Sequence, residues 1–250
     1  MAESALALRE HPQIIELLSV LEQNSLSKQK EEVQALVGYI DGMEEKLSQM
    51  MDEMKAMRLE VEKLHDKGIR ARCAQLVGTA EGKIRQGKTM LSTARTNFVS
   101  AAGRMLGTFQ EKGRAALRHA VQALRIPSVL SRMGRGFAHA EKSMGQLAVR
   151  LDAMREELHQ AGGHIKNAGL ALAGKESQES KELSADKGVL AKLRSFVLYC
   201  GKAFSEMDRD TALTVERING GRSSVKTELQ GLKSAQAGQR RQAASKEQAR

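Results

Sequence analysis

The chain has 250 residues and a formal net charge of +10; only 3% of its residues are aromatic, and Trp is absent. An apolar core must therefore come from Leu, Ala, Met and Val. Pro12 and Pro127 are the only prolines, and the long interval between them favours long helices. Cys73 and Cys200 form no CxxC pair, which argues against a disulfide framework or a zinc site.

The beginning of the chain does not resemble a targeting segment. No basic stretch followed by an apolar run opens the sequence MAESALALREHPQ. No stretch approaches the roughly 18 apolar residues of a membrane span. Together with the two isolated cysteines, these features predict a cytoplasmic protein.

The first part of the chain predicts a short helix followed by a long one. Residues 1–24 should hold a helix from Pro12 to about Asn24, and Ser25 or Ser27 should cap a heptad helix over residues 25–67. Apolar side chains recur there at spacings of three and four, the pattern of a coiled-coil seam. The seam consists of Val33, Leu36, Ile40, Met43, Leu47, Met50, Met54, Met57, Val61 and Leu64.

Two interpretations of this seam are open, with equal weight. It can mediate self-association, because the contacts considered beside the seam of a parallel homodimer bring no like charges together. Alternatively, it can pack against other helices of the same chain.

The next segment, residues 68–126, has an apolar period of eleven. One position of this repeat is occupied by Ile69, Ala80, Leu91, Ala102, Gly113 and Leu124. Three turns per eleven residues predict a nearly straight amphipathic helix from about Ile69 to Arg125. Arg95 is the main charged residue on its apolar side.

The charge is concentrated in the same region. Residues 68–140 contain 13 basic and 2 acidic residues, a surplus of 11 that exceeds the net charge of the whole chain. Such a basic segment suits the phosphate backbone of nucleic acids. The candidate contacts are Lys83, Arg85, Lys88, Arg95 and Arg104. A solvated basic face that meets acidic residues of a neighbouring helix is the other open interpretation.

Pro127 should end the basic helix and begin a second heptad helix over residues 127–174, with large seam residues first and small ones, Ala161 and Ala168, later. A polar linker is predicted at 175–188, a short helix at 189–219 and a disordered tail at 220–250. The predicted fold is all-α: an elongated bundle of long helices with coiled-coil seams and a disordered C-terminal tail.

The stretch GKIRQGKT, Gly82 to Thr89, matches the phosphate-binding P-loop letter for letter. A P-loop must follow a buried strand and open a helix, whereas Ile84 and Gly87 belong to the apolar stripe of a helix that continues on both sides. We therefore expect no nucleotide binding here. The sequence predicts no catalytic residue, no metal or cofactor site and no small-molecule substrate, and hence no enzyme.

Three stretches carry a family resemblance: ELHQAGGHIKNAGLALAGKE, Glu157 to Glu176; GYIDGMEEKLSQMMDEMKAMRLEVEKL; and FQEKGRAAL. Over residues 12–205 the chain resembles an uncharacterised family of helical proteins carried on integrative and conjugative mobile elements of gut Firmicutes. The resemblance implies a cytoplasmic accessory protein of a mobile genetic element and assigns no residue roles.

Three functional hypotheses follow. The first is a non-enzymatic helical scaffold or interaction protein, whose partner is another protein or a second copy. The second is sequence-nonspecific binding of the nucleic-acid backbone through residues 68–140, with a steep salt dependence. The third, adsorption to an anionic membrane surface, ranks last because Trp is absent and Tyr is scarce.

Overall fold

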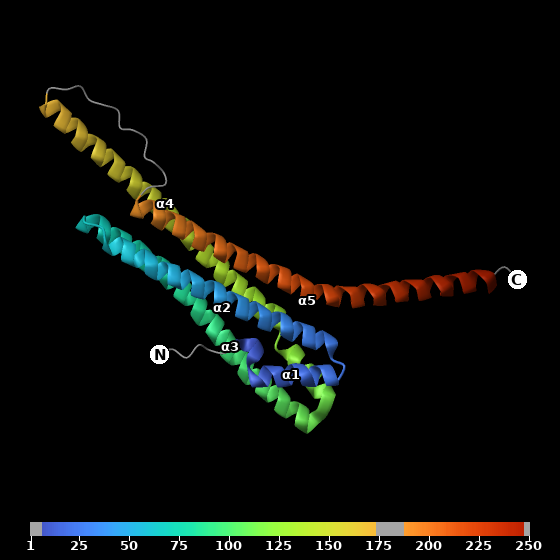
Figure 1. The fold of residues 1–250 in the computed structure, drawn as a ribbon. Helices are drawn as coiled ribbons and strands as arrows, with labels where there is room; N and C mark the ends of the chain where they lie inside the picture. Colours follow the sequence, from blue (N-terminus) through green and yellow to red (C-terminus); the bar gives the residue numbers. More distant parts are fainter. Residues whose placement is uncertain (1–6, 174–187, 248–250) are drawn as a thin grey trace. The chain divides into compact units, whose positions relative to one another are not determined.

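The structure is a computed structural model that describes residues 7–173 and 188–247, without the side chains of residues 165, 169 and 220–247. The described part is all-α, and four long helices form a bundle (Figure 1). The 3₁₀ turn η1 (Leu8–Glu10) and α1 (Pro12–Gln23) come first, followed by α2 (Ser27–Glu62), α3 (Lys67–Ala123), α4 (Ile126–Leu172) and α5 (Val189–Glu247). The predicted linker, apart from Gly188, and the predicted tail, residues 220–250, lie outside the residues described in full.

The prediction of α1 is confirmed, but the connection to α2 differs from the predicted serine cap. Ser25 has a φ of 54°, and the backbone N–H of Leu26 donates to the carbonyl of Leu21 at 2.9 Å. This 6→1 bond, with the N–H of Ser25 on the carbonyl of Glu22, forms a Schellman motif that ends α1. Ser27 is the first residue of α2 rather than its cap.

The turn between α2 and α3 also shifts one predicted boundary. α2 ends at Glu62, so Leu64, the last residue of the predicted seam, lies in the turn. Asp66 precedes α3 and accepts a hydrogen bond from the backbone N–H of Ile69 at 2.8 Å through its side chain. This bond satisfies one of the free N–H groups of the first turn, as an N-cap does.

The expectation of a nearly straight helix after Gly68 is wrong at one residue. Gly113 has φ 72° and ψ −165°, a conformation that essentially only glycine adopts, and it breaks the helical geometry within α3. The ribbon of α3 bends sharply before it reaches α4 (Figure 1). The apolar stripe itself is confirmed, since its members Ala80, Ile84, Leu91 and Leu106 are buried.

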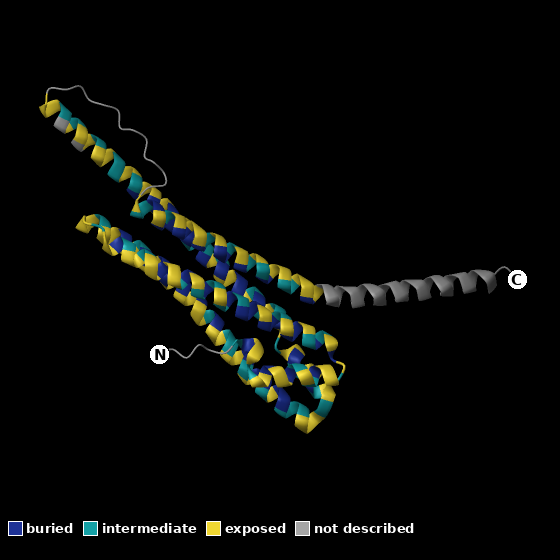
Figure 2. Ribbon diagram, in the orientation of Figure 1, coloured by how far each residue is buried: buried dark blue, intermediate teal, exposed yellow. Residues whose placement is uncertain are grey.

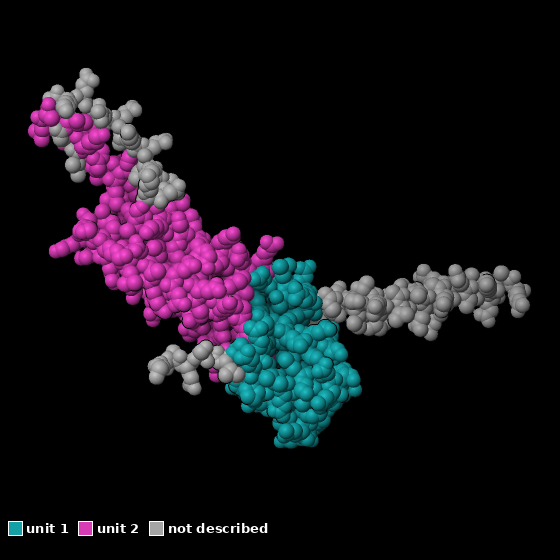
Figure 3. Space-filling model, viewed as in Figure 1, with its two compact units in different colours: residues 1–39, 99–131, 210–250 teal, residues 40–98, 132–209 magenta. Residues whose placement is uncertain are grey.

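The chain divides into two compact units, which share the long helices (Figure 3). Unit 1 contains residues 1–39, 99–131 and 210–250. Its core combines buried residues of α1, α2 and α3, among them Leu17, Leu36 and Leu117 (Figure 2). The hydroxyl groups of Tyr39 and Thr211, both buried, are hydrogen-bonded to each other and join α2 to α5.

Unit 2 contains residues 40–98 and 132–209, with one stretch from each long helix. Phe137 of α4 and Phe204 of α5 stack in its core with ring centroids 6.1 Å apart. Gly87 of α3 allows Leu47 of α2 to come close, because a Cβ at residue 87 would lie 3.2 Å from the Cδ1 of Leu47. None of the described helices combines the length and apolar character that a membrane crossing requires.

Candidate functional site

The P-loop look-alike lies inside α3. Residues 82–89 are helical, with α3 extending beyond them on both sides. Ile84 is buried, and the ammonium group of Lys88 donates a hydrogen bond to the hydroxyl of Ser48 on α2 at 3.4 Å. The helical interpretation of this stretch is confirmed, and its backbone N–H groups are engaged in the helix rather than turned towards a phosphate.

The first heptad seam packs within the chain. Eight of its ten residues are buried by the chain itself, and the other two, Met57 and Leu64, are half-buried. Of the two interpretations left open by the sequence, this burial favours intramolecular packing. A homodimer through the same seam would require the helices of the chain to separate first.

The second heptad seam, on α4, changes character along its length. Its residues from Leu130 to Met154 are buried, whereas Leu158 is half-buried and Ala161 and Ala168 are exposed. Leu172, its last member, is 91% exposed. The apolar pattern of α4 therefore continues beyond the part of the helix that other described residues bury.

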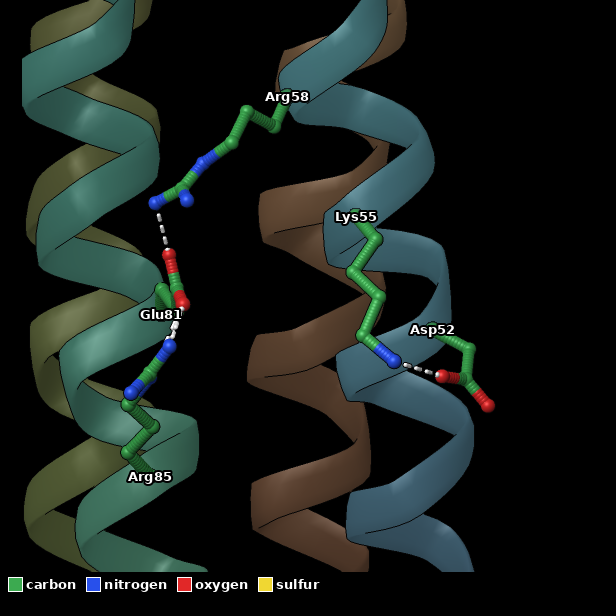
Figure 4. A network of polar contacts seen from close by, with 5 residues as sticks. All are labelled: Asp52, Lys55, Arg58, Glu81 and Arg85. Carbon is green, nitrogen blue, oxygen red and sulfur yellow. Dashed lines mark hydrogen bonds and ion pairs between the residues drawn. The ribbon is translucent and has the colours of Figure 1, made fainter. Parts of the chain in front are cut away.

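Three of the basic residues of α3 in unit 2 meet carboxylates: Arg72, Arg85 and Arg95. Glu81, which is 9% exposed at its side chain, accepts hydrogen bonds from two arginines: Arg85, four residues later on α3, at 2.9 Å, and Arg58 of α2 (Figure 4). The guanidinium group of Arg58 joins α2 to α3 through this nearly buried carboxylate, whereas Arg85 pairs with it within α3. Arg85, one of the predicted phosphate contacts, is thus paired within its own helix, although its side chain is 69% exposed.

Arg95, another predicted phosphate contact, lies largely away from solvent. Its side chain is 14% exposed and donates to Glu44 of α2 at 2.9 Å. An ion pair this far from solvent holds two helices together and has little surface left for a ligand. A third pair, Arg72 with Glu157 of α4 at 3.4 Å, is exposed and weaker.

The basic residues at the other end of α3, in unit 1, have a different environment. Five of them are exposed, and within the described residues none makes an ion pair. We call this set the α3-end cations: Arg104, Lys112, Arg114, Arg118 and Arg125. Glu111 is the only acid within residues 99–131; the other acids of unit 1 lie in residues 1–39 and 210–250.

The cysteines are poor nucleophiles. Both thiols are buried. Burial raises the pKa of Cys73, and burial together with the nearby Glu53 raises the pKa of Cys200 to about 12. Because its pKa is raised, Cys200 stays protonated at neutral pH, whereas the reactive form of cysteine is the thiolate. No cluster of His, Cys, Asp or Glu that could hold a metal ion occurs among the described residues.

Two grooves of unit 2 bring polar groups together without a catalytic arrangement. A groove of about 490 Å³ between α2 and α5 is lined by Met57, Phe196, Tyr199 and Lys192, among others. The ammonium group of Lys192 donates to Glu60 at 3.2 Å, and hydrogen bonds from Lys63 and Lys192 lower the pKa of Glu60. A second groove, between α2 and α3, contains Lys67 and Arg70.

Some of these environments had a signal in the sequence. Arg95 was the charged residue on the apolar side of its helix, and such a position predicts burial with a partner. Glu81 stands four residues before Arg85, the spacing of a helical ion pair. Lys112, Arg114, Arg118 and Arg125 are not among the phosphate contacts predicted from the sequence, and their exposure depends on how the neighbouring helices pack.

Comparison with known proteins gives one family. A family model described as a family of unknown function (DUF6674) matches residues 10–250. No curated protein and no solved structure matches the chain.

Proposed function

We propose that this chain, which belongs to the DUF6674 family of unknown function, is a non-enzymatic helical scaffold that binds another protein through the exposed surface of its long helices. The chain uses its first apolar seam and several ion pairs for its own packing. What remains for a partner is the surface that this packing leaves uncovered.

The observation that carries the proposal is the end of the α4 seam. Ala161 and Ala168 are exposed and small, so another helix can approach closely, and Leu172 offers a large apolar side chain in the same series. A partner helix that continues the heptad packing would cover these positions. The proposed partner is therefore a helical protein rather than a small molecule.

The resemblance to proteins of integrative and conjugative elements supports the biological setting. It rests on stretches that include ELHQAGGHIKNAGLALAGKE, within which most of the uncovered α4 seam lies. We propose that the scaffold is an accessory protein of a mobile genetic element and acts in the cytoplasm.

Cross-linking in the native host tests the scaffold. Leu172→Glu should abolish the capture of a protein that the unchanged chain captures, because a carboxylate would be buried at the contact. Val149→Glu is the matched control, since Val149 is a 68% exposed apolar residue of the same helix but outside the seam. Equal capture by both variants would contradict the proposal.

A second candidate function is binding of the nucleic-acid backbone through residues 68–140. The observation that favours it is that ten of the thirteen basic residues of this segment make no ion pair with a described residue, so most of the surplus charge is available to an anion. Retention of a labelled duplex at low salt, and its loss at high salt, is the expected result. No retention at low salt would reject this function.

A further inference from the structure

We infer that the α3-end cations form the surface on which the chain binds duplex nucleic acid, through phosphate groups and without sequence preference. The inference rests on the second candidate function above and specifies its site. It moves the contact away from the residues first predicted, of which only Arg104 belongs to this set.

The first argument is the contrast in charge pairing. Residues 68–98 of unit 2 contain six basic residues, and carboxylates of α2, α3 and α4 engage three of them, Arg72, Arg85 and Arg95. The other three, Arg70, Lys83 and Lys88, make no ion pair within the described residues. Residues 99–131 of unit 1 contain five exposed cations and one acid, and none of the five cations is paired within the described residues. A phosphate approaching these cations displaces no existing carboxylate. Phosphate binding therefore does not have to offset the loss of an existing ion pair.

The second argument is the arrangement of three arginines. Arg114 and Arg118 are four residues apart and lie on one face of α3, about 6 Å apart along the helix axis. Arg125 follows in the turn between α3 and α4. Phosphates of one strand are spaced about 3.4 Å apart along the duplex axis, so long arginine side chains on this stripe can reach several of them. Like charges at this spacing weaken an isolated helix slightly, which an anionic partner would reverse.

A nucleic acid fits this surface better than a lipid bilayer does. Adsorption to a membrane needs apolar side chains beside the basic ones. The large apolar residues among the α3-end cations are instead turned inwards: Met105, Leu106, Leu117 and Val121 are buried, and Phe109 and Leu124 are half-buried. None of these six side chains is fully exposed, as insertion between lipids would require.

The shortage of exposed aromatic side chains favours a duplex over a single strand as the ligand. Binding of single strands usually relies on exposed aromatic rings that stack on the bases. In the stretch that carries the α3-end cations the one Phe, Tyr or Trp is Phe109, which is half-buried. Contacts to the phosphates alone are expected, and these do not read the sequence.

The test is fluorescence anisotropy with a short labelled DNA duplex of mixed sequence, titrated with the full chain at several salt concentrations. Arg114→Gln/Arg118→Gln/Arg125→Gln should weaken binding at low salt at least about tenfold and make the slope of log K against log salt shallower by about 2 to 3. The matched control, Arg70→Gln/Lys83→Gln/Lys88→Gln, removes the same charge from unit 2 and should change affinity less than about threefold.

A charge-preserving variant guards against a folding defect. Arg114→Lys/Arg118→Lys/Arg125→Lys should keep the salt slope of the unchanged chain, with circular dichroism confirming the helix content of all variants. If it loses as much affinity as the glutamine variant, charge is not the cause and the inference is overturned.

The remaining outcomes separate the inference from the function on which it rests. Equal loss in the glutamine variant and the unit 2 control would overturn the α3-end site while retaining nucleic-acid binding by residues 68–140. No binding by the unchanged chain would overturn both. Equally tight binding to phosphatidylserine vesicles, lost in the same variant, would overturn the assignment to nucleic acid.

Discussion

Residues 67–98 and residues 99–123 of α3 are both basic, but their arginines have different surroundings. In the first part, Arg85 and Arg95 are held by Glu81 and Glu44. In the second, Arg114 and Arg118 are exposed and unpaired within the described residues. Net charge along a sequence therefore does not measure the charge available to a partner, because carboxylates on neighbouring helices consume part of it.

The largest effect on stability is expected in the core of unit 2, to which residues 67–98 of α3 belong. Leu47→Ala removes the side chain that lies against Gly87 and should lower the free energy of unfolding by about 2 to 5 kcal/mol. Because the seam packs within the chain, the denaturation midpoint should not depend on protein concentration. Leu59→Ala, at an exposed position of α2, is the control and should change little.

Light scattering on the same samples completes this test. A chain that packs its own seam should have a molar mass near 27.4 kDa. A dimer that Leu47→Ala converts into folded monomers would show that the seam mediates self-association after all.

The next largest effect concerns the ion pair of Arg95. Glu44→Ala leaves a guanidinium group at a position only 14% exposed, and we expect a loss of about 2 to 3 kcal/mol in the free energy of unfolding. Asp52→Ala breaks the exposed pair with Lys55 and should leave the free energy of unfolding almost unchanged. Urea denaturation followed by circular dichroism compares the two. Equal losses of stability in the two variants would mean that Arg95 is as well solvated as Lys55. Arg95 would then not differ in environment from the exposed arginines Arg114 and Arg118.

A smaller effect is expected at the break in α3. Gly113→Ala forces a side chain into φ 72°, ψ −165° and should destabilise unit 1 by about 1 to 2 kcal/mol. Gly107→Ala, on the helical part of α3 with open space around the new Cβ, should stabilise by up to about 1 kcal/mol. The two variants should thus shift the thermal midpoint in opposite directions. Shifts of the same sign would contradict the break.

The smallest effect is expected at Lys88. On the surface of α3 this residue loses only a weak hydrogen bond to Ser48, so Lys88→Ala should stay within about 0.5 kcal/mol of the unchanged chain in stability. Calorimetric titration with magnesium and ATP or GTP should detect no binding tighter than about 100 µM in either protein. Saturable binding that Lys88→Ala abolishes would contradict the helical interpretation of GKIRQGKT.

The sequence by itself determined the helices and their apolar faces. Pro12 and Pro127 fall in the first turns of α1 and α4, and the heptad and eleven-residue periods identify buried positions such as Leu47 and Ile84. Turn boundaries were less accurate, since Ser25 proved to end α1 and Asp66 to cap α3. Periodicity is a local property, so it can be read from neighbours a few residues away.

Only the tertiary structure decided what each face meets. Arg95 and Arg104 look alike in the sequence as basic residues of one segment, yet Glu44, 51 residues away, engages the first, while the second is exposed. The non-helical conformation of Gly113 could not be predicted from the sequence either, because other glycines of α3 lie within regular helix. Pairing and exposure depend on residues distant in the chain, and the period of one helix carries no information about the side chains that pack across from it.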